Sequence, residues 1–367
     1  MQHIKQLDSL RGIAVLLVML SHWIPTPASQ MGAFMGVNTF FVLSGFLISN
    51  ILFINKNAAE ATGHSKLIIL KNFIFRRALR IFPIYFLVVI SLAILGESRI
   101  PGIHYDLKYL LTFTSNFHTY LVKHFGKYTA HLWSLAVEEQ FYLVWPWLML
   151  FLKRKYIPLA ILIFILTGTI SDSFVKDGFG YLLTHTCLSA FGLGALLSWV
   201  YICKPQFLAI FFRLLNYIII AELVIVLLFM FGLPFPALPL RTMLSIVALW
   251  VITHIVINNQ GGKKLKFSFL LNSNKLIFIG KISYGVYLYH IYVPYLTSGF
   301  LNYLQIALPY FLKPYAFIFY LISNLCIAFG FSWLSWRYLE IPIMRLKRYF
   351  EYQAPKSPRF PGKPQYA

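Results

Sequence analysis

The sequence predicts an all-α fold, a polytopic integral membrane bundle of about ten transmembrane helices with cytoplasmic N- and C-termini. Its residues are 59% hydrophobic and only 12% charged, with a mean hydropathy of +0.70. Soluble domains are closer to half apolar and a quarter charged. The apolar runs approach the roughly 20 residues that a helix needs to cross a bilayer. Basic residues also concentrate in every second connection, which sets the orientation.

Orientation follows from the Lys and Arg residues in the connections. With the N-terminus placed in the cytoplasm, 25 of the 32 basic residues lie in cytoplasmic segments and seven lie on the other side. Such an excess marks cytoplasmic loops, so it predicts an even number of spans. The net charge of +21 therefore indicates contact with anionic membrane lipids, and we expect no nucleic acid partner. The three cysteines lie in or beside apolar runs and predict neither a disulfide nor a metal site.

Each predicted span is an apolar run bounded by polar residues, and the third continues backwards as a basic amphipathic stretch. In chain order the spans are 8–25, 34–53, 81–96, 131–152, 156–171, 180–201, 214–232, 240–258, 277–300 and 315–336.

The first span carries ionisable residues at both ends. Eleven residues separate Arg11 from His22, which is within about 20° of three helical turns and roughly 16 Å along the axis. Both side chains therefore share one face, and Asp8 joins them from three residues before Arg11. An intramembrane histidine is a functional candidate because it is costly to keep without a task. A structural histidine bonded between helices is the alternative.

The second and third spans add a small-residue pair and an arginine pair. Ser44 and Gly45 in mid-span permit close helix packing, and Ser44 could also contact a ligand. Arg77 and Arg80 share a face at the cytoplasmic surface. Guanidinium groups bind phosphate in a bidentate manner, whereas the alternative for this pair is a basic anchor that reaches lipid headgroups.

The fourth span contains two adjacent carboxylates, Glu138 and Glu139. Each charge at the centre of a span costs roughly 2.5–3.5 kcal/mol on insertion scales. We therefore expect at least one of them to meet a cationic partner, namely Arg11, His22 or His290. A buried structural ion pair is the alternative.

Apart from the ninth, the later spans carry few polar or ionisable side chains. The fifth to eighth are assigned to packing, with Asp172 and Asp177 in an outer turn. In the ninth, Tyr287 and His290 are three residues apart and share a side. They could hydrogen-bond a carbonyl or a sugar hydroxyl, or form an aromatic seam between helices. The membrane domain is expected to cover residues 1–346, followed by a polar, Pro-rich and disordered cytoplasmic tail at 347–367.

Taken together, these stretches resemble the membrane-bound acyltransferases of family 3, the O-acyltransferases that modify bacterial surface glycans. The matching segments run in family order through nearly the whole chain. They are Leu7–Ala14 with His22, Phe41–Ile48, Arg77–Arg80, Trp133–Tyr142, Ile282–His290 and Arg337–Pro342. The chain departs from the family at Ser9, where glycine is common, and at Tyr289, where tryptophan is usual. Many members carry a fused esterase-like domain, which we do not expect here because about 30 residues follow the last span.

The resemblance implies an enzyme of the inner (plasma) membrane that uses acyl-CoA, usually acetyl-CoA, as a donor substrate, with no permanently bound cofactor. His22 matches the family's essential histidine, Arg11 a basic residue before it, and Arg77 and Arg80 a paired-arginine motif. His22 would act as general base or carry the acyl group itself, and both routes stay open.

Further roles follow from combining the resemblance with the chemistry of the residues. Glu138, or Glu139 as second choice, would orient the imidazole. Ser44 would contact the donor or, with Tyr287 and His290, hold the developing oxyanion. Asp8, Tyr287 and His290 complete the expected substrate contacts.

Two other classes of protein remain open at this stage. A proton-coupled transporter also uses intramembrane Glu and His, although the matching halves that are common in transporters are not evident. A scaffold protein without turnover is the other. The acceptor could be a lipopolysaccharide, an exopolysaccharide, a lipid-linked saccharide or a small molecule, and the oligomeric state is not predicted.

Overall fold

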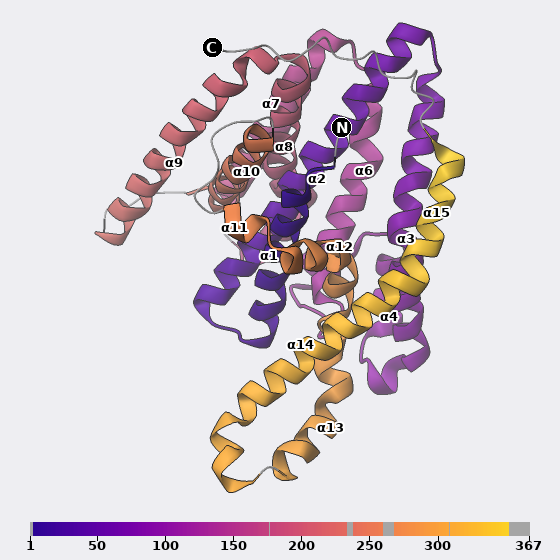
Figure 1. The fold of residues 1–367 in the computed structure, drawn as a ribbon, viewed down its shortest axis with the longest axis vertical. Coiled ribbons are helices and arrows are strands. Elements are labelled where there is room, and N and C mark those ends of the chain that lie inside the picture. Colours follow the sequence, from indigo (N-terminus) through magenta and orange to yellow (C-terminus); the bar gives the residue numbers. More distant parts are fainter. Residues whose placement is uncertain (1–2, 176, 233–237, 260–267, 308, 352–367) are drawn as a thin grey trace.

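The computed structural model describes residues 3–175, 177–232, 238–259, 268–307 and 309–351, and within these ranges the regular structure is entirely helical (Figure 1). The predicted fold class, an all-helical multi-pass membrane protein, is confirmed.

The described residues of the N-terminal half of the chain form seven α-helices, of which α2 and α3 are the longest. They are α1 (Lys5–Trp23), α2 (Pro27–Thr62), α3 (Lys66–Arg99), α4 (Ile103–Leu111), α5 (Ser115–Val122), α6 (Trp133–Phe151) and α7 (Ile157–Phe174). The helices that follow complete the bundle. They are α8 (Thr184–Cys203), α9 (Leu208–Met230), α10 (Leu240–Asn259), α11 (Ser268–Leu271), α12 (Asn274–Tyr289), α13 (Tyr292–Ala307), α14 (Ala316–Ser335), a π-helical turn (Trp336–Glu340) and α15 (Ile341–Arg345).

In the described parts of the chain, nine of the ten predicted spans each overlap one α-helix and the ninth overlaps two, but the helices are not equally apolar. Among the described residues, seven are long and apolar enough to cross a membrane, or up to eight if one bent pair is a single span. Helices α1 and α6 are not among the seven. They are less apolar because α1 carries Asp8 and Arg11 and α6 carries Glu138 and Glu139. Part of the predicted chemistry, on α1 and α6, therefore lies on helices that are less apolar than the seven.

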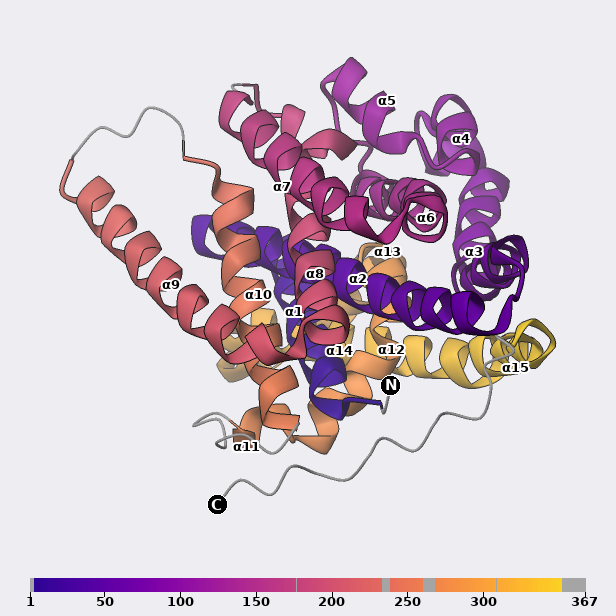
Figure 2. The ribbon, with the colours of Figure 1, turned by 90° about the horizontal axis from the view of Figure 1, so that it is seen from above.

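Helix α2 lies at the centre of the bundle, between α1 and α8 (Figure 2). The crossing with α8 depends on Gly45. An added Cβ there would collide with the backbone carbonyl of Phe191, and one at Gly194 would collide with the carbonyl of Val42. The predicted close approach at Ser44–Gly45 is thus present, and it fixes the depth of Ser44 in the bundle.

The periphery of the bundle is formed by α9, which stands apart and connects through α10 (Figures 1 and 2). Only 6% of its most apolar 18-residue stretch is buried inside the protein. Its outward-facing apolar side chains are suited to lipid contact. Helix α9 is therefore peripheral, and the predicted site residues lie on other helices.

The ninth predicted span corresponds to two helices, α12 and α13, between which the chain bends by 67°. The break falls at His290, four residues before Pro294. Proline has no N–H and its ring clashes with the carbonyl four residues earlier, so the helix cannot continue past His290. The freed His290 carbonyl instead accepts a hydrogen bond of 2.9 Å from the Trp23 indole. The kink places His290 beside the end of α1.

The chain beyond α15 packs back onto α3. A 3₁₀ helix, Leu346–Phe350, accepts hydrogen bonds from Arg76 through the carbonyl of Lys347, and Phe350 stacks on Phe75. Ordered structure thus extends four residues past the boundary expected at residue 346. The rest of the predicted tail, residues 352–367, lies outside the described residues.

Candidate functional site

Two cavities lie along α1, one at each end. Arg11 lines the first, which we name the cationic cavity. His22 lines the second, which we name the histidine cavity. The predicted spacing on one helix face thus places the two side chains at different cavities rather than in a single pocket.

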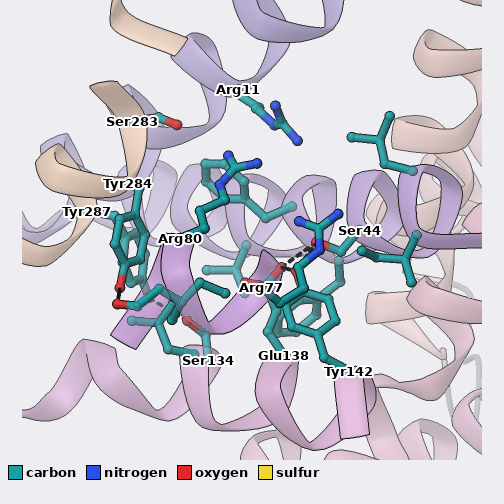
Figure 3. Close-up of a pocket in the computed structure, with 17 residues that line it drawn as sticks. Arg11, Ser44, Arg77, Arg80, Ser134, Glu138, Tyr142, Ser283, Tyr284 and Tyr287 are labelled. Atoms are coloured by element: carbon teal, nitrogen blue, oxygen red, sulfur yellow. Dashed lines mark hydrogen bonds between the residues drawn. The ribbon is translucent and has the colours of Figure 1, made fainter. Parts of the chain in front are cut away.

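The cationic cavity has a volume of about 90 Å³ and contains three arginines, Arg11, Arg77 and Arg80. Figure 3 shows their guanidinium groups together on one side of it. Arg11 is held by Asp8 at 3.4 Å, which is the predicted i,i+3 pair. Asp8 also contacts His3 at 2.8 Å and lines neither cavity, so it acts on the site through Arg11.

A hydrogen-bond network lies next to the arginines (Figure 3). The Ser44 hydroxyl donates to Glu138 Oε1 at 2.5 Å, and the Tyr142 hydroxyl donates to the same oxygen at 3.2 Å. Arg77 lies over the Tyr142 ring at 5.6 Å. This network joins α2, α6 and α3 at one point, so Glu138 helps to fix the positions of the cavity walls.

The cationic partners of Glu138 differ from those expected. The charges that act on its carboxyl are those of Arg77 and Arg80, since α3 packs against α6. Arg11, His22 and His290 do not bond to it. Glu139 lies off the cavity wall, and its Oε1 is buried without a hydrogen-bond partner. The expected orientation of His22 by either carboxylate is therefore absent from this structure.

His290 takes the place expected for the carboxylate. Its Nδ1 lies 2.7 Å from the Tyr287 carbonyl, and its Nε2 lies 3.3 Å from His22 Nδ1. His22 Nδ1 also lies 2.9 Å from the Val18 carbonyl. A carbonyl oxygen can only accept, so neutral His22 carries its hydrogen on Nδ1 and neutral His290 does the same. His22 Nε2 therefore keeps its lone pair and is free to accept a proton.

The histidine cavity is much larger, with a volume of about 940 Å³. His22 is exposed to it, whereas His290 is fully buried behind His22. His131 also lines the cavity, with its ring centroid 5.2 Å from that of His290. Within the described part of the chain, no group of three potential metal ligands has a geometry that could hold an ion.

A thin partition separates the two cavities. Val37 and Tyr287 line both of them. The Tyr287 hydroxyl lies 2.6 Å from the Ser134 hydroxyl and donates to the His131 carbonyl at 2.7 Å. Tyr287 is thus held by α6 between the arginines and the histidines, where a group passing from one cavity to the other would meet it.

Sequence reasoning missed one buried cation, Arg241, which lies behind the wall of the histidine cavity and bonds to Asp172 and Tyr181 of that wall. Arg241 is fully buried; its Nη1 donates to Asn38 and its Nη2 to the Tyr181 carbonyl, both at 2.7 Å. Its backbone N–H donates to Asp172 at 2.9 Å. Asp172 directly follows the fifth predicted span, and Arg241 lies at the start of the eighth. Both ends are on the same predicted side of the membrane, and this is the signal that could have paired the two residues.

Comparison with known proteins identifies the family. The family model of acyltransferase 3, described as an acyltransferase domain, matches residues 4–333. The O-acetyltransferase OatA of Staphylococcus aureus (strain NCTC 8325 / PS 47) is 28% identical over 387 residues, 94% of this chain and 58% of that protein. The peptidoglycan O-acetyltransferase OatA of Listeria monocytogenes is 34% identical over 166 residues, 41% of this chain and 25% of that protein.

The chain matches only part of the length of its relatives. The chain spans 58% of the length of the curated relatives that it matches over most of its own length. No solved structure matches it. Since the family model covers nearly all of the described helices that line the two cavities, the chain belongs to the acyltransferase 3 family.

Proposed function

We propose that this protein transfers an acyl group, most simply acetyl, from cytoplasmic acyl-CoA to a hydroxyl of a glycan on the other side of the bacterial plasma membrane. The observation that carries the proposal is the pair of cavities that meet at Tyr287 and Val37. One cavity presents guanidinium groups, and the other presents an exposed histidine with a free nitrogen. The relatives named as O-acetyltransferases support acetyl as the group, and the Listeria protein's name makes peptidoglycan the first acceptor to test.

The donor would enter from the cationic cavity. Coenzyme A carries several phosphates, and Arg11, Arg77 and Arg80 offer forked donors for them. The cavity is only about 90 Å³, so we expect the narrow pantetheine arm to enter it while the nucleotide stays at its mouth. Glu138 would keep Ser44 and Tyr142 in place along that path.

The chemical step would take place at the His22 imidazole. The acceptor hydroxyl gives its proton to His22 Nε2 as its oxygen attacks the thioester carbon. A carbon–oxygen bond forms, the carbon–sulfur bond breaks, and the proton passes from His22 to the departing CoA sulfur. His290 Nε2 accepts from His22 Nδ1–H and so stabilises the imidazolium. The Tyr287 and Ser134 hydroxyls bond to each other and to the His131 carbonyl in this structure, and one of them would turn from that carbonyl to donate to the oxyanion.

A covalent route uses the same residues. In that route His22 Nε2 attacks the thioester, the CoA thiolate leaves, and the acceptor hydroxyl then takes the acyl group from the acyl-imidazole. Rapid mixing of the protein with radiolabelled acetyl-CoA, followed by acid quenching without acceptor, separates the two routes. Label bound to the protein supports the covalent route, and its absence supports direct transfer.

The experiment that tests the proposal measures CoA release by the purified protein in nanodiscs. Acetyl-CoA is supplied with and without peptidoglycan fragments, and the glycan product is analysed by mass spectrometry. We expect CoA release that depends on the glycan and a product heavier by one acetyl group per transfer. Binding of acetyl-CoA without glycan-dependent release or any acetylated product would contradict the proposal for this acceptor class.

A further inference from the structure

A third cavity lies in the cap formed by α4 and α5, and we name it the cap cavity. It has a volume of about 620 Å³ and is closed on one side by residues 124–129. Arg80 of α3 lines the cationic cavity and Arg99 of α3 lines the cap cavity. This separation corresponds to roughly 28 Å of helix. The cap cavity therefore lies at the opposite end of the bundle, on the side predicted to be extracytoplasmic.

The wall of the cap cavity contains a fixed carboxylate–imidazole pair. His118 Nδ1 lies 3.4 Å from Asp106 Oδ1, and the Thr129 hydroxyl donates to Asp106 Oδ2 at 3.2 Å. The His118 ring stacks on Tyr109 with centroids 4.0 Å apart and an angle of 11°. An added Cβ at Gly126 would displace the Thr129 hydroxyl, which is the group that donates to Asp106. The ring is thus held with Nδ1 toward Asp106.

Two polar atoms of this wall have no partner. Ser115 Oγ and His118 Nε2 are both buried and make no hydrogen bond. Both belong to α5, three residues apart, so they share a face, and both residues line the cap cavity. A buried polar atom without a partner is costly, which indicates a ligand for this wall. Burial lowers the pKa of His118, so the imidazole is neutral at pH 7 and Nε2 accepts hydrogen bonds.

Helix α5 is anchored to the core rather than loosely attached. Gln140 of α6 donates to the Phe113 carbonyl at 2.7 Å and to Asn116 at 2.9 Å. Asn116 in turn donates to the Thr184 hydroxyl at 3.1 Å. Gln140 directly follows the two carboxylates of α6, so the helix that shapes the cationic cavity also positions Ser115 and His118.

The cap cavity and the histidine cavity share a wall. Phe125 and Ala130 line the histidine cavity, while Gly126 and Thr129 line the cap cavity. The two spaces are therefore neighbours on either side of one short chain segment. A linear acceptor with one unit at His22 could place another unit in the cap cavity.

We propose that the cap cavity is a second saccharide-binding subsite, which holds a sugar residue of the acceptor chain while another residue reacts at His22. This inference rests on the proposed function. The cavity offers the rings of Tyr105 and Tyr128 beside the hydrogen-bonding groups of Ser115 and His118. A sugar ring matches this arrangement, because its apolar C–H face can stack on an aromatic ring while its hydroxyls form hydrogen bonds. The charges of Arg99 and Lys127 are only half offset by Asp106, so it is the tyrosine rings and the hydrogen-bonding groups, rather than the charge, that point to a saccharide.

The test uses the full chain in nanodiscs with acetyl-CoA and acceptors of increasing length, namely N-acetylglucosamine, chitobiose and chitotetraose. His118→Gln and Ser115→Ala remove the two unpartnered atoms. His104→Gln is the matched control, since His104 is an exposed histidine of α4 that does not line the cavity. We expect KM for chitotetraose to rise about tenfold in His118→Gln and about fivefold in Ser115→Ala, as for a lost hydrogen bond. KM for N-acetylglucosamine should stay within about twofold.

A second arm measures the Kd of chitotetraose without acetyl-CoA, so it does not depend on turnover. The Kd should rise by the same factors in the two variants and stay unchanged in His104→Gln. Loss of turnover in all proteins, with variant-sensitive binding retained, would refute acyl transfer to this acceptor and keep the subsite. Equal KM and Kd for chitotetraose in wild type, His118→Gln and Ser115→Ala would overturn the subsite, as would failure of wild type to bind chitotetraose.

Discussion

The cationic cavity and the histidine cavity share Val37 and Tyr287 but differ in size and chemistry. The first has a volume of about 90 Å³ and three arginines, whereas the second has a volume of about 940 Å³ and an exposed histidine. A narrow basic cavity is suited to a phosphorylated carrier with a slender arm, and a wide cavity with a histidine in a largely apolar wall is suited to a bulky acceptor. The difference indicates that donor and acceptor reach Tyr287 from opposite directions. Variants that act on one cavity should therefore leave the kinetics of the other substrate unchanged.

The largest effect is expected for His22, the proposed general base. His22→Ala removes the exposed imidazole that lies next to His290, and we expect kcat to fall by about 10³-fold, as for loss of a general base. Steady-state CoA release measures it. The matched control, His185→Ala, replaces an exposed histidine of α8 and should retain wild-type kcat. A His22→Ala protein that folds and keeps kcat within about tenfold of wild type would remove His22 from the chemistry.

The cationic cavity should show its role in donor affinity. Arg77→Ala and Arg80→Ala should each raise KM for acetyl-CoA by about 10- to 100-fold, because each loses a charge-assisted hydrogen bond to phosphate. KM for the glycan should not change. Arg77→Lys should recover the affinity only in part, since an ammonium group cannot bind in the bidentate manner.

Arg154→Ala is the control for the arginine variants. Arg154 is exposed and pairs with Glu60 at 2.5 Å, away from the cavity. It should keep the wild-type KM for acetyl-CoA. Equal donor KM in wild type and in both cavity variants would mean that the arginines are membrane anchors rather than a donor site.

His290 should act on turnover and not on donor binding. His290→Ala removes one of the two acceptors of the His22 Nδ1–H and leaves only the Val18 carbonyl, so kcat should fall by about 10- to 100-fold while KM for acetyl-CoA stays the same. His290→Gln retains an accepting carbonyl and should recover part of kcat. A purely structural role would instead lower the thermal unfolding temperature of both variants equally, with no difference in kcat between them.

The smallest effect is expected at the kink. Trp23→Phe removes the indole donor to the His290 carbonyl, and we expect kcat to fall about fivefold, which matches one neutral hydrogen bond. Trp147→Phe replaces an exposed tryptophan of α6 and serves as the control. An unchanged kcat in Trp23→Phe would show that the bond does not position His290.

Much of this arrangement is predictable from local patterns. The apolar runs predict the positions of the long helices, and helical spacing predicts that Asp8 and Arg11 pair. The small pair Ser44–Gly45 predicts a close crossing, which the structure shows with Phe191 of α8.

What was not predictable depends on contacts between distant segments. Glu138 bonds to Ser44, which lies 94 residues away in the chain, and His290 approaches His22 across 268 residues. The spacing within one helix holds no information about either contact. The break at His290 could have been expected from Pro294, whose missing N–H frees a carbonyl, but not the indole of Trp23 that satisfies it. From the sequence alone Arg241 is one more basic residue outside the cytoplasmic segments, because its partners lie in α2 and before α8.

The central claim is that donor and acceptor react across the membrane. It is tested most directly in proteoliposomes with the protein in one known orientation. Acetyl-CoA is sealed on the side of the cationic cavity, and a membrane-impermeant oligosaccharide is supplied on the side of the histidine cavity. The account predicts acetylated oligosaccharide under this arrangement and none when the two substrates exchange sides. Product that forms only when both substrates are on the same side of the membrane would contradict it.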